Sequence, residues 1–162
     1  MKIIVIESII LCLLFSLMIF IFSRKPINTL YNYPPKIQER IKSLDRYKGQ
    51  IPSNEKKLGT KLLAALLVVL VFSLILRYIN GYKTFTEGFK YSYLLWTIIN
   101  IYDALVMDII WFCHDPYFVI EGSEDMVDEY HDYLFHIKQS LIGQLIALPV
   151  CILIGLVVSY IL

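Results

Sequence analysis

The chain has 162 residues, of which 57% are apolar, and its mean hydropathy is +0.62. Soluble domains usually contain about 45–50% apolar residues, so this composition argues against an ordinary soluble domain. The formal net charge of +1 gives no electrostatic signal for a nucleic-acid partner. The three cysteines are odd in number, far apart and set in apolar runs, which predicts small buried side chains rather than a disulfide framework.

The first apolar run predicts a transmembrane helix at 3–22, close to the 20 or so residues that a helix needs to cross a bilayer. Only Lys2 precedes this run, and no small-residue cleavage site follows it. We therefore expect a retained helix rather than a cleaved signal peptide. The charged and proline-containing sequence at 23–26 should end the helix.

The polar stretch 23–57 predicts a long loop between the first two spans. Within it, Ile37, Ile41 and Leu44 fall at helical spacing among basic residues. This pattern suits either a short amphipathic helix lying on the membrane surface or a solvated linker turn.

Three more apolar stretches predict further transmembrane helices, at 58–79, 91–113 and 124–162. Ser123, followed by acidic residues, resembles the cap of the last helix, which should enter the membrane near Leu141. Gly143 and Gly155 would allow close contact between helices. The predicted fold class is all-α: one membrane domain, 1–162, forming a four-transmembrane-helix bundle, with the surface helix of the first loop as a further option.

The distribution of Lys and Arg predicts the orientation. Ten of these residues lie between Arg24 and Lys61, whereas the opposite connections carry four. By the positive-inside rule, loops 23–57 and 114–138 should be cytoplasmic, and both termini should lie outside the cell membrane. In a bacterium this membrane would be the inner membrane.

Acidic residues inside the third predicted span are the first candidates for function. At 100° per residue, Asn100 and Asp103 share one helix face, and Asp108 flanks it. An acid in the bilayer interior costs at least about 2.5–3.5 kcal/mol unless it is paired or hydrated, so such residues are rare and usually functional. The alternative is a structural role, in which the acids join helices through hydrogen bonds.

A second group of polar residues lies near the cytoplasmic ends of the third and fourth helices. Glu129, Asp132 and His136 are spaced to share one helix face, and the predicted topology brings His114 and Asp108 to the same membrane side. These five residues could bind a divalent metal ion, and the sequence identifies no other cofactor. Without a metal, Asp108, His114, Asp132 and His136 could act as acid and base groups. A solvated acidic helix and a pH-sensitive contact remain as alternatives.

Two functional hypotheses follow. The first is a membrane-embedded enzyme or ligand-binding site that acts on a lipid or isoprenoid at the cytoplasmic ends of the third and fourth helices. The alternative is a small transporter or an accessory subunit of a membrane complex, using Asp103 and Asp108, with a polar path through Glu7, Asn100 and Asp103. The expected partners are membrane lipids and either further copies of the chain or a larger complex. Glu7 itself is expected to pair with Lys2 or Arg77.

Two blocks in the C-terminal half of the chain resemble a known group of proteins. The block from Trp111 to Pro116, together with Glu129 to Tyr133, resembles small bacterial membrane proteins with four spans. The resemblance implies a four-span membrane fold. No activity is known for that group, so it implies nothing about chemistry.

Overall fold

A computed structural model of the protein describes residues 2–51 and 54–161. Among these residues the structure is helical and contains no strand. Four helical stretches are long and apolar enough to cross a membrane: Ile3–Ile21, Leu62–Ile79, Phe85–Phe112 and Val127–Ile161. The predicted all-α fold with four spans is therefore confirmed, and these spans identify a multi-pass membrane protein.

Six α-helices form the framework: α1 (Lys2–Phe22), α2 (Pro35–Ser43), α3 (Asn54–Leu74), α4 (Phe85–Tyr102), α5 (Val127–Tyr130) and α6 (Tyr133–Leu156). Three long helices continue as π-helical segments, namely η3 (Ile75–Ile79) after α3, η4 (Asp103–Phe112) after α4 and η6 (Val157–Ile161) after α6. Short 3₁₀ segments occupy the loops: η1 (Pro26–Asn32), η2 (Asp45–Tyr47) and η5 (Pro116–Phe118).

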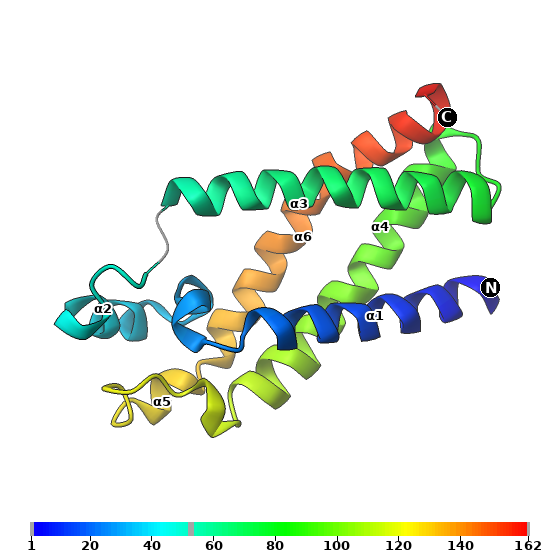
Figure 1. Ribbon diagram of the computed structural model, residues 1–162. Helices are drawn as coiled ribbons and strands as arrows, with labels where there is room; N and C mark the ends of the chain where they lie inside the picture. Colours follow the sequence, from blue (N-terminus) through cyan, green and yellow to red (C-terminus); the bar gives the residue numbers. More distant parts are fainter. Residues whose placement is uncertain (1, 52–53, 162) are drawn as a thin grey trace.

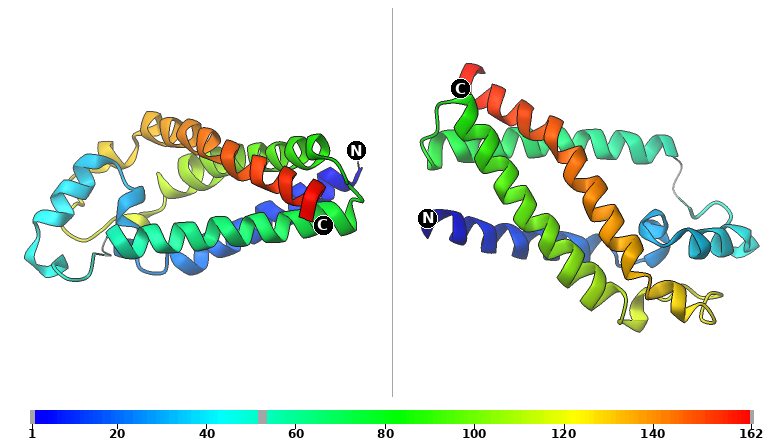
Figure 2. Two further views of the ribbon diagram at one scale, coloured as in Figure 1. Left: turned by 90° about the horizontal axis from the view of Figure 1, so that it is seen from above. Right: turned by 180° about the vertical axis from the view of Figure 1, so that it is seen from behind.

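The central pair of the bundle is α4 and α6, which pack against each other along their lengths. α1 lies against α4, and α3 lies against α6. Both termini and the α3–α4 connection lie at one end, whereas α2 and α5 lie at the other (Figures 1 and 2). An even number of spans accounts for this arrangement.

Glycines permit the close crossing of α4 and α6. A Cβ atom added at Gly88 would lie 3.0 Å from Gly155 Cα, and one added at Gly155 would lie 2.9 Å from the Phe85 ring. The close contact expected at Gly155 is therefore confirmed, and Gly88 is the partner that the sequence did not identify. Beside this crossing lies an apolar core of buried residues: Phe72, Leu76, Leu95, Ile154 and Val158.

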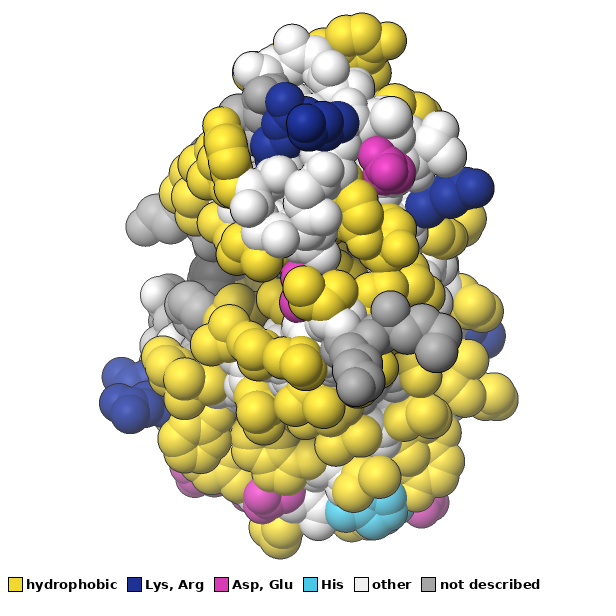
Figure 3. Space-filling view, turned by 90° about the vertical axis from the view of Figure 1, so that its right-hand side faces the viewer, with side chains coloured by type: hydrophobic (Ala, Val, Ile, Leu, Met, Phe, Trp, Pro, Cys, Tyr) yellow, Lys and Arg dark blue, Asp and Glu magenta, His cyan; other side chains and the backbone are white. Residues whose placement is uncertain are grey.

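The outer helices are covered by little protein. Only 6% of the Ile3–Ile21 span is buried, and large apolar side chains are exposed along both α1 and α3. Figure 3, which views the molecule from the end where the termini lie, shows hydrophobic side chains over most of the visible surface, with basic, acidic and histidine side chains scattered among them. Lipid is the environment in which such a surface is stable.

The third span begins earlier than expected. α4 starts at Phe85 rather than near residue 91, because Thr84 and Glu87 form a capping box. Thr84 accepts a hydrogen bond from the Glu87 backbone N–H, and Glu87 in turn accepts one from the Thr84 backbone N–H. The T-x-x-E spacing is the sequence signature of this motif. The connection expected between residues 79 and 91 is therefore partly the first turns of the helix.

The fourth span is not one helix from 124 to 162, and this prediction was wrong. α5 ends at Tyr130, and α6 starts afresh at Tyr133 with Asp132 as its cap, accepting a hydrogen bond from Phe135 N at 3.0 Å. Ser123 does not cap the long helix. Its hydroxyl bonds to Ile120 O at 2.6 Å and to the Tyr130 hydroxyl at 2.8 Å. The last residue of the predicted range lies outside the described residues.

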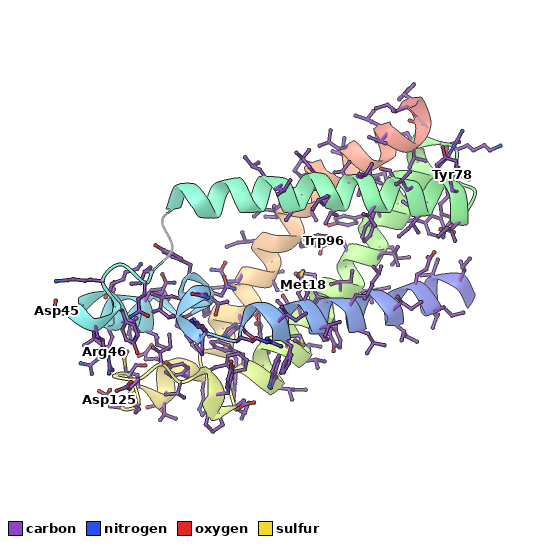
Figure 4. The ribbon with its side chains drawn as sticks, viewed as in Figure 1. Met18, Asp45, Arg46, Tyr78, Trp96 and Asp125 are labelled. Carbon is purple, nitrogen blue, oxygen red and sulfur yellow. The ribbon has the colours of Figure 1, made fainter. Side chains whose placement is uncertain are left out.

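The first loop folds against the loop between α4 and α6. Ile37 and Ile41 on α2 are fully buried in a small core that also contains Leu30, Tyr33, Ile120 and Tyr130. Three ion pairs surround this core: Lys36–Glu129, Arg40–Asp125 and Arg46–Glu121. Figure 4 shows Arg46 and Asp125 together at this end of the molecule. The predicted helix exists, but its apolar face is covered by protein and is not free to enter a membrane surface.

Candidate functional site

A cavity of about 470 Å³ lies between α1, η1, α4, η4 and α6. Its polar wall consists of Ser23, Thr29, Asn32, Asn100, Asp103, Asp108, His136, Gln139 and Ser140. Its apolar and aromatic wall includes Phe15, Ile19, Trp96, Met107, Trp111, Phe112, Phe118 and Phe135. The volume falls within the 300–1,000 Å³ usual for small-molecule sites, which are mostly apolar with a few polar groups.

The π-helical segment η4 places both intramembrane acids on this cavity. In an α-helix, residues five apart point about 140° away from each other, since each residue turns by 100°. In a π-helix the backbone bond joins residues five apart, as between Cys113 N and Asp108 O at 3.0 Å. Asp103 and Asp108, five residues apart, consequently line the same cavity.

Asp108 and His136 are the two ionisable residues of the cavity whose side chains contact each other. Asp108 Oδ2 lies 3.2 Å from His136 Nδ1, so an acid from η4 meets an imidazole from α6. The His136 side chain is only 3% exposed, whereas that of Asp108 is 30% exposed. Phe112 packs against the imidazole with ring centroids 5.2 Å apart. Asp108 is therefore the more accessible member of the pair, and His136 is the one enclosed by protein.

Three residues that line the cavity each have a buried polar atom without a hydrogen-bond partner among the described residues: Ser23 Oγ, Trp96 Nε1 and His136 Nε2. Ser23 directly follows α1, Trp96 belongs to α4 and His136 belongs to α6. Figure 4 shows Trp96 in the middle of the bundle, between α1 and α3 in that view. A buried polar group without a partner is costly, so these three residues leave hydrogen-bonding capacity unused beside the cavity.

Other polar groups of the span are already satisfied by helix-to-helix bonds. Asn100 Nδ2 donates to Ser140 O at 3.0 Å and to Gln144 Oε1 at 3.2 Å. Gln144 donates in turn to Thr97 Oγ1 at 2.7 Å. This network joins α4 to α6, which is the structural role considered for polar residues in the span.

The five predicted metal-binding or catalytic residues do not converge, because only Asp108 and His136 meet. Glu129 pairs with Lys36, and Asp132 caps α6. His114 Nδ1 lies 2.8 Å from Ile109 O, and its Nε2 lies 3.2 Å from the Tyr133 hydroxyl. Within residues 2–51 and 54–161, no cluster of three or more His, Cys, Asp or Glu side chains is arranged to hold a metal ion.

The break at His131 and Asp132 explains this separation. On one continuous helix, Glu129, Asp132 and His136 would share a face, but the chain changes direction between α5 and α6.

Next to the site, burial raises the pKa of the Cys113 thiol to about 11, and the charges of Asp108 and Asp132 add to the effect. The thiol is therefore protonated at neutral pH and is a poor nucleophile.

Glu7, the start of the alternative transport path, lies elsewhere. Its Oε2 accepts a hydrogen bond from Asn80 Nδ2 at 3.2 Å, and it does not line the cavity. No ion pair between Glu7 and Arg77 is present among the described residues, so that expected pairing is wrong. The Lys2 side chain lies outside the described residues. Of the three path residues, Asn100 and Asp103 share the cavity and Glu7 does not.

The wall supplied by α1 and η1 was missed by the sequence reasoning. Phe15 and Ile19 read as ordinary residues of a lipid-facing span, and Ser23 as the start of the loop, and nothing in their local pattern marks them as cavity residues. Only the packing of α1 on α4 places them there. One bond that fixes this packing joins Ser16 Oγ to the Tyr102 hydroxyl at 2.7 Å.

Comparisons of the chain with protein-family models, with curated proteins and with solved structures gave no match. The case for a function consequently depends on the cavity and its residues.

Proposed function

We propose that the protein binds an amphiphilic membrane molecule, of lipid or isoprenoid type, in the cavity, and that Asp108 and His136 form an acid–base pair acting on its head group. The observation that carries the proposal is the Asp108–His136 contact at 3.2 Å on the wall of a cavity of about 470 Å³. A mixed wall of this kind suits a molecule with one polar end and one apolar chain.

The different exposure of the Asp108 and His136 side chains assigns them different roles in this proposal. The more exposed Asp108 carboxylate is the group that a head group would contact, where it can accept a hydrogen bond or a proton. His136 is a positioning residue, because its Nδ1 holds the carboxylate and its ring is enclosed by protein. The pair resembles the general arrangement in which one group is oriented by its neighbour for proton transfer.

The side of the membrane is part of the proposal. The loop end of the molecule, where the cavity residues Thr29 and Asn32 lie, carries most of the Lys and Arg of the chain. The positive-inside rule then places this end in the cytoplasm and both termini outside. The cavity would open toward the cytoplasmic leaflet, and in a bacterium that leaflet belongs to the inner membrane.

The test is native mass spectrometry of the protein released from mild detergent. Wild type should retain one amphiphile of defined mass, and Gly143→Phe, which fills the cavity from α6, should lose it. Asp108→Asn should weaken retention or, with an active enzyme, prevent conversion of a membrane lipid extract followed by liquid chromatography and mass spectrometry. Asp128→Asn, at an exposed position in α5, is the matched control. Equal retention by wild type and Gly143→Phe would contradict the proposal.

Orientation can be tested separately with a membrane-impermeant maleimide on intact cells. Single cysteines replace Lys83 in the α3–α4 connection or Ser43 in α2, both of which are exposed. The proposed orientation predicts labelling at position 83 and protection at position 43. The reverse pattern would overturn the orientation and leave the cavity proposal intact.

A further inference from the structure

The charge of the cavity wall restricts the head group that the cavity can accept. Two carboxyl side chains, Asp103 and Asp108, line the cavity together with His136, and no Lys or Arg is among the lining residues that the structure describes. The nearest basic residues in sequence are Arg24 and Lys25, which follow Ser23, and Lys138, which precedes Gln139, and all three are exposed. An anionic head group would therefore meet two acidic side chains with no Lys or Arg among the described lining residues to balance them, and such like-charge contacts are unfavourable.

Backbone groups do not compensate for the missing cations. Helix N-termini bind anions through unpaired N–H groups, and the first turn of α6 borders the cavity at Phe135 and His136. This terminus is already capped, since Asp132 accepts the hydrogen bond from Phe135 N at 3.0 Å. The Asp132 carboxylate adds a further negative charge at the position where a phosphate would otherwise bind.

The unpartnered buried atoms point to the opposite kind of ligand. Ser23 and His136 line the cavity, and each has a buried polar atom without a partner among the described residues. Trp96 Nε1 is a donor that calls for an acceptor, whereas the carboxyl oxygens of Asp103 and Asp108 can accept hydrogen bonds from a ligand, Asp108 beside its contact with His136. Hydroxyl groups satisfy both needs, and an amine satisfies the acids.

We infer that the cavity selects amphiphiles whose head group carries hydroxyl or amino groups and no negative charge, and excludes those ending in phosphate or carboxylate. This inference rests on the proposed function, because it names the class of molecule that the same cavity takes. It also restricts the chemistry: the Asp108–His136 pair would act on an alcohol or amine, not on a phosphate ester.

The chain contains its own reporter for the test. Its two tryptophans, Trp96 and Trp111, both line the cavity, so their fluorescence reports what enters it. The probes are three single-chain amphiphiles with the same brominated tail and an amine, an alcohol or a phosphate head. Bromine quenches tryptophan on contact, and titration into full-length protein in neutral detergent separates saturable binding from linear partitioning.

Wild type should show saturable quenching by the amine and the alcohol, each binding about tenfold or more tightly than the phosphate. Asp103→Asn and Asp108→Asn keep the side-chain shape and remove the charge, so each should reduce the preference for amine over phosphate. Asp128→Asn should leave the preference unchanged. The two variants also serve as alternatives to each other if one of them does not fold.

The remaining outcomes separate the two proposals. Phosphate binding as tight as amine or alcohol binding would overturn the head-group inference while leaving an amphiphile-binding cavity in place. Linear quenching by all three probes, equal to that of free tryptophan in the same detergent, would overturn the cavity proposal together with the inference. A preference for amine over phosphate that persists unchanged in both Asn variants would also overturn the inference, because the inference assigns that preference to the Asp103 and Asp108 carboxylates.

Discussion

His136 Nδ1 lies 3.2 Å from Asp108 Oδ2, and this contact joins α6 to the π-helical segment η4. The two residues are 28 positions apart in the sequence and belong to different spans. The contact is therefore both a candidate for chemistry and a link in the bundle. Its structural contribution can be measured independently of any ligand.

Replacing His136 by Ala should destabilise the protein. The change removes the contact with Asp108 and opens a space beside Phe112, and the loss of one hydrogen bond alone costs about 0.5–1.5 kcal/mol. The thermal midpoint in detergent, followed by circular dichroism, should fall for His136→Ala. His131→Ala, at an exposed position, should change it little. Equal effects of the two substitutions would show that the Asp108 contact contributes nothing to stability.

Replacing Gly155 by Val should separate α4 from α6. The new side chain would overlap the Phe85 ring, which lies 2.9 Å from the position of its Cβ, and overpacking of this kind costs about 1–3 kcal/mol. Gly59→Val in α3 is the matched control, since its Cβ would meet no atom within 4 Å among the described residues. Thermal midpoints and the homogeneity of size-exclusion profiles should distinguish the two variants. A larger effect at position 59 would argue against the crossing.

The docking of the two loops can be tested by exchanging charges. Arg40→Glu should repel Asp125 and loosen α2, whereas Arg40→Glu combined with Asp125→Arg should restore the ion pair. Exposed pairs contribute only about 0.2–1 kcal/mol, so the readout should be amide hydrogen exchange in α2 rather than global unfolding. The difference between the variants should shrink in 1 M salt, where the Debye length is about 3 Å. If the double variant exchanges as fast as the single one, the pair does not hold the loops together.

The turn before α5 should loosen in acid. The Glu124 carboxylate accepts a hydrogen bond from Gly122 N at 2.8 Å, and hydrogen bonds with the backbone N–H groups of Glu124 and Gly122 hold the pKa of Glu124 below its ordinary value of 4.5. A depressed pKa stabilises the folded turn above the unfolded value, and this contribution is lost as the pH falls through the lower folded value. Amide exchange at Gly122, after correction for the intrinsic rate, should therefore increase below pH 4.5.

Glu124→Gln tests the cause of this pH dependence. The variant lacks the titrating group, so the corrected exchange at Gly122 should become independent of pH in the same range. Asp128→Asn should retain the wild-type profile. A pH dependence that survives Glu124→Gln would assign the effect to another group.

Several features of this protein were predictable because they depend on local composition. A run of about 20 apolar residues crosses a bilayer as a helix, since lipid offers no partner for backbone N–H and C=O groups. This reasoning gave the four spans, and the spacing of Ile37 and Ile41 gave the helical option that α2 confirmed. The capping box at Thr84 was also present in the sequence, although the helix start was placed six residues too late.

The composition of the cavity was decided by the tertiary structure. The sequence singled out Asp108 and His136, but it grouped them with Glu129 and Asp132. In the structure Glu129 pairs with Lys36, and Asp132 caps α6. A fixed turn of 100° per residue cannot anticipate a π-helical segment, which brings Asp103 and Asp108 to one wall. The sequence by itself thus determined how often the chain crosses the membrane and which spans carry polar residues, because hydrophobicity acts over each segment alone. Only the packing of α1, α4 and α6 decided which polar residues meet, because that depends on helix rotation and on contacts between distant segments.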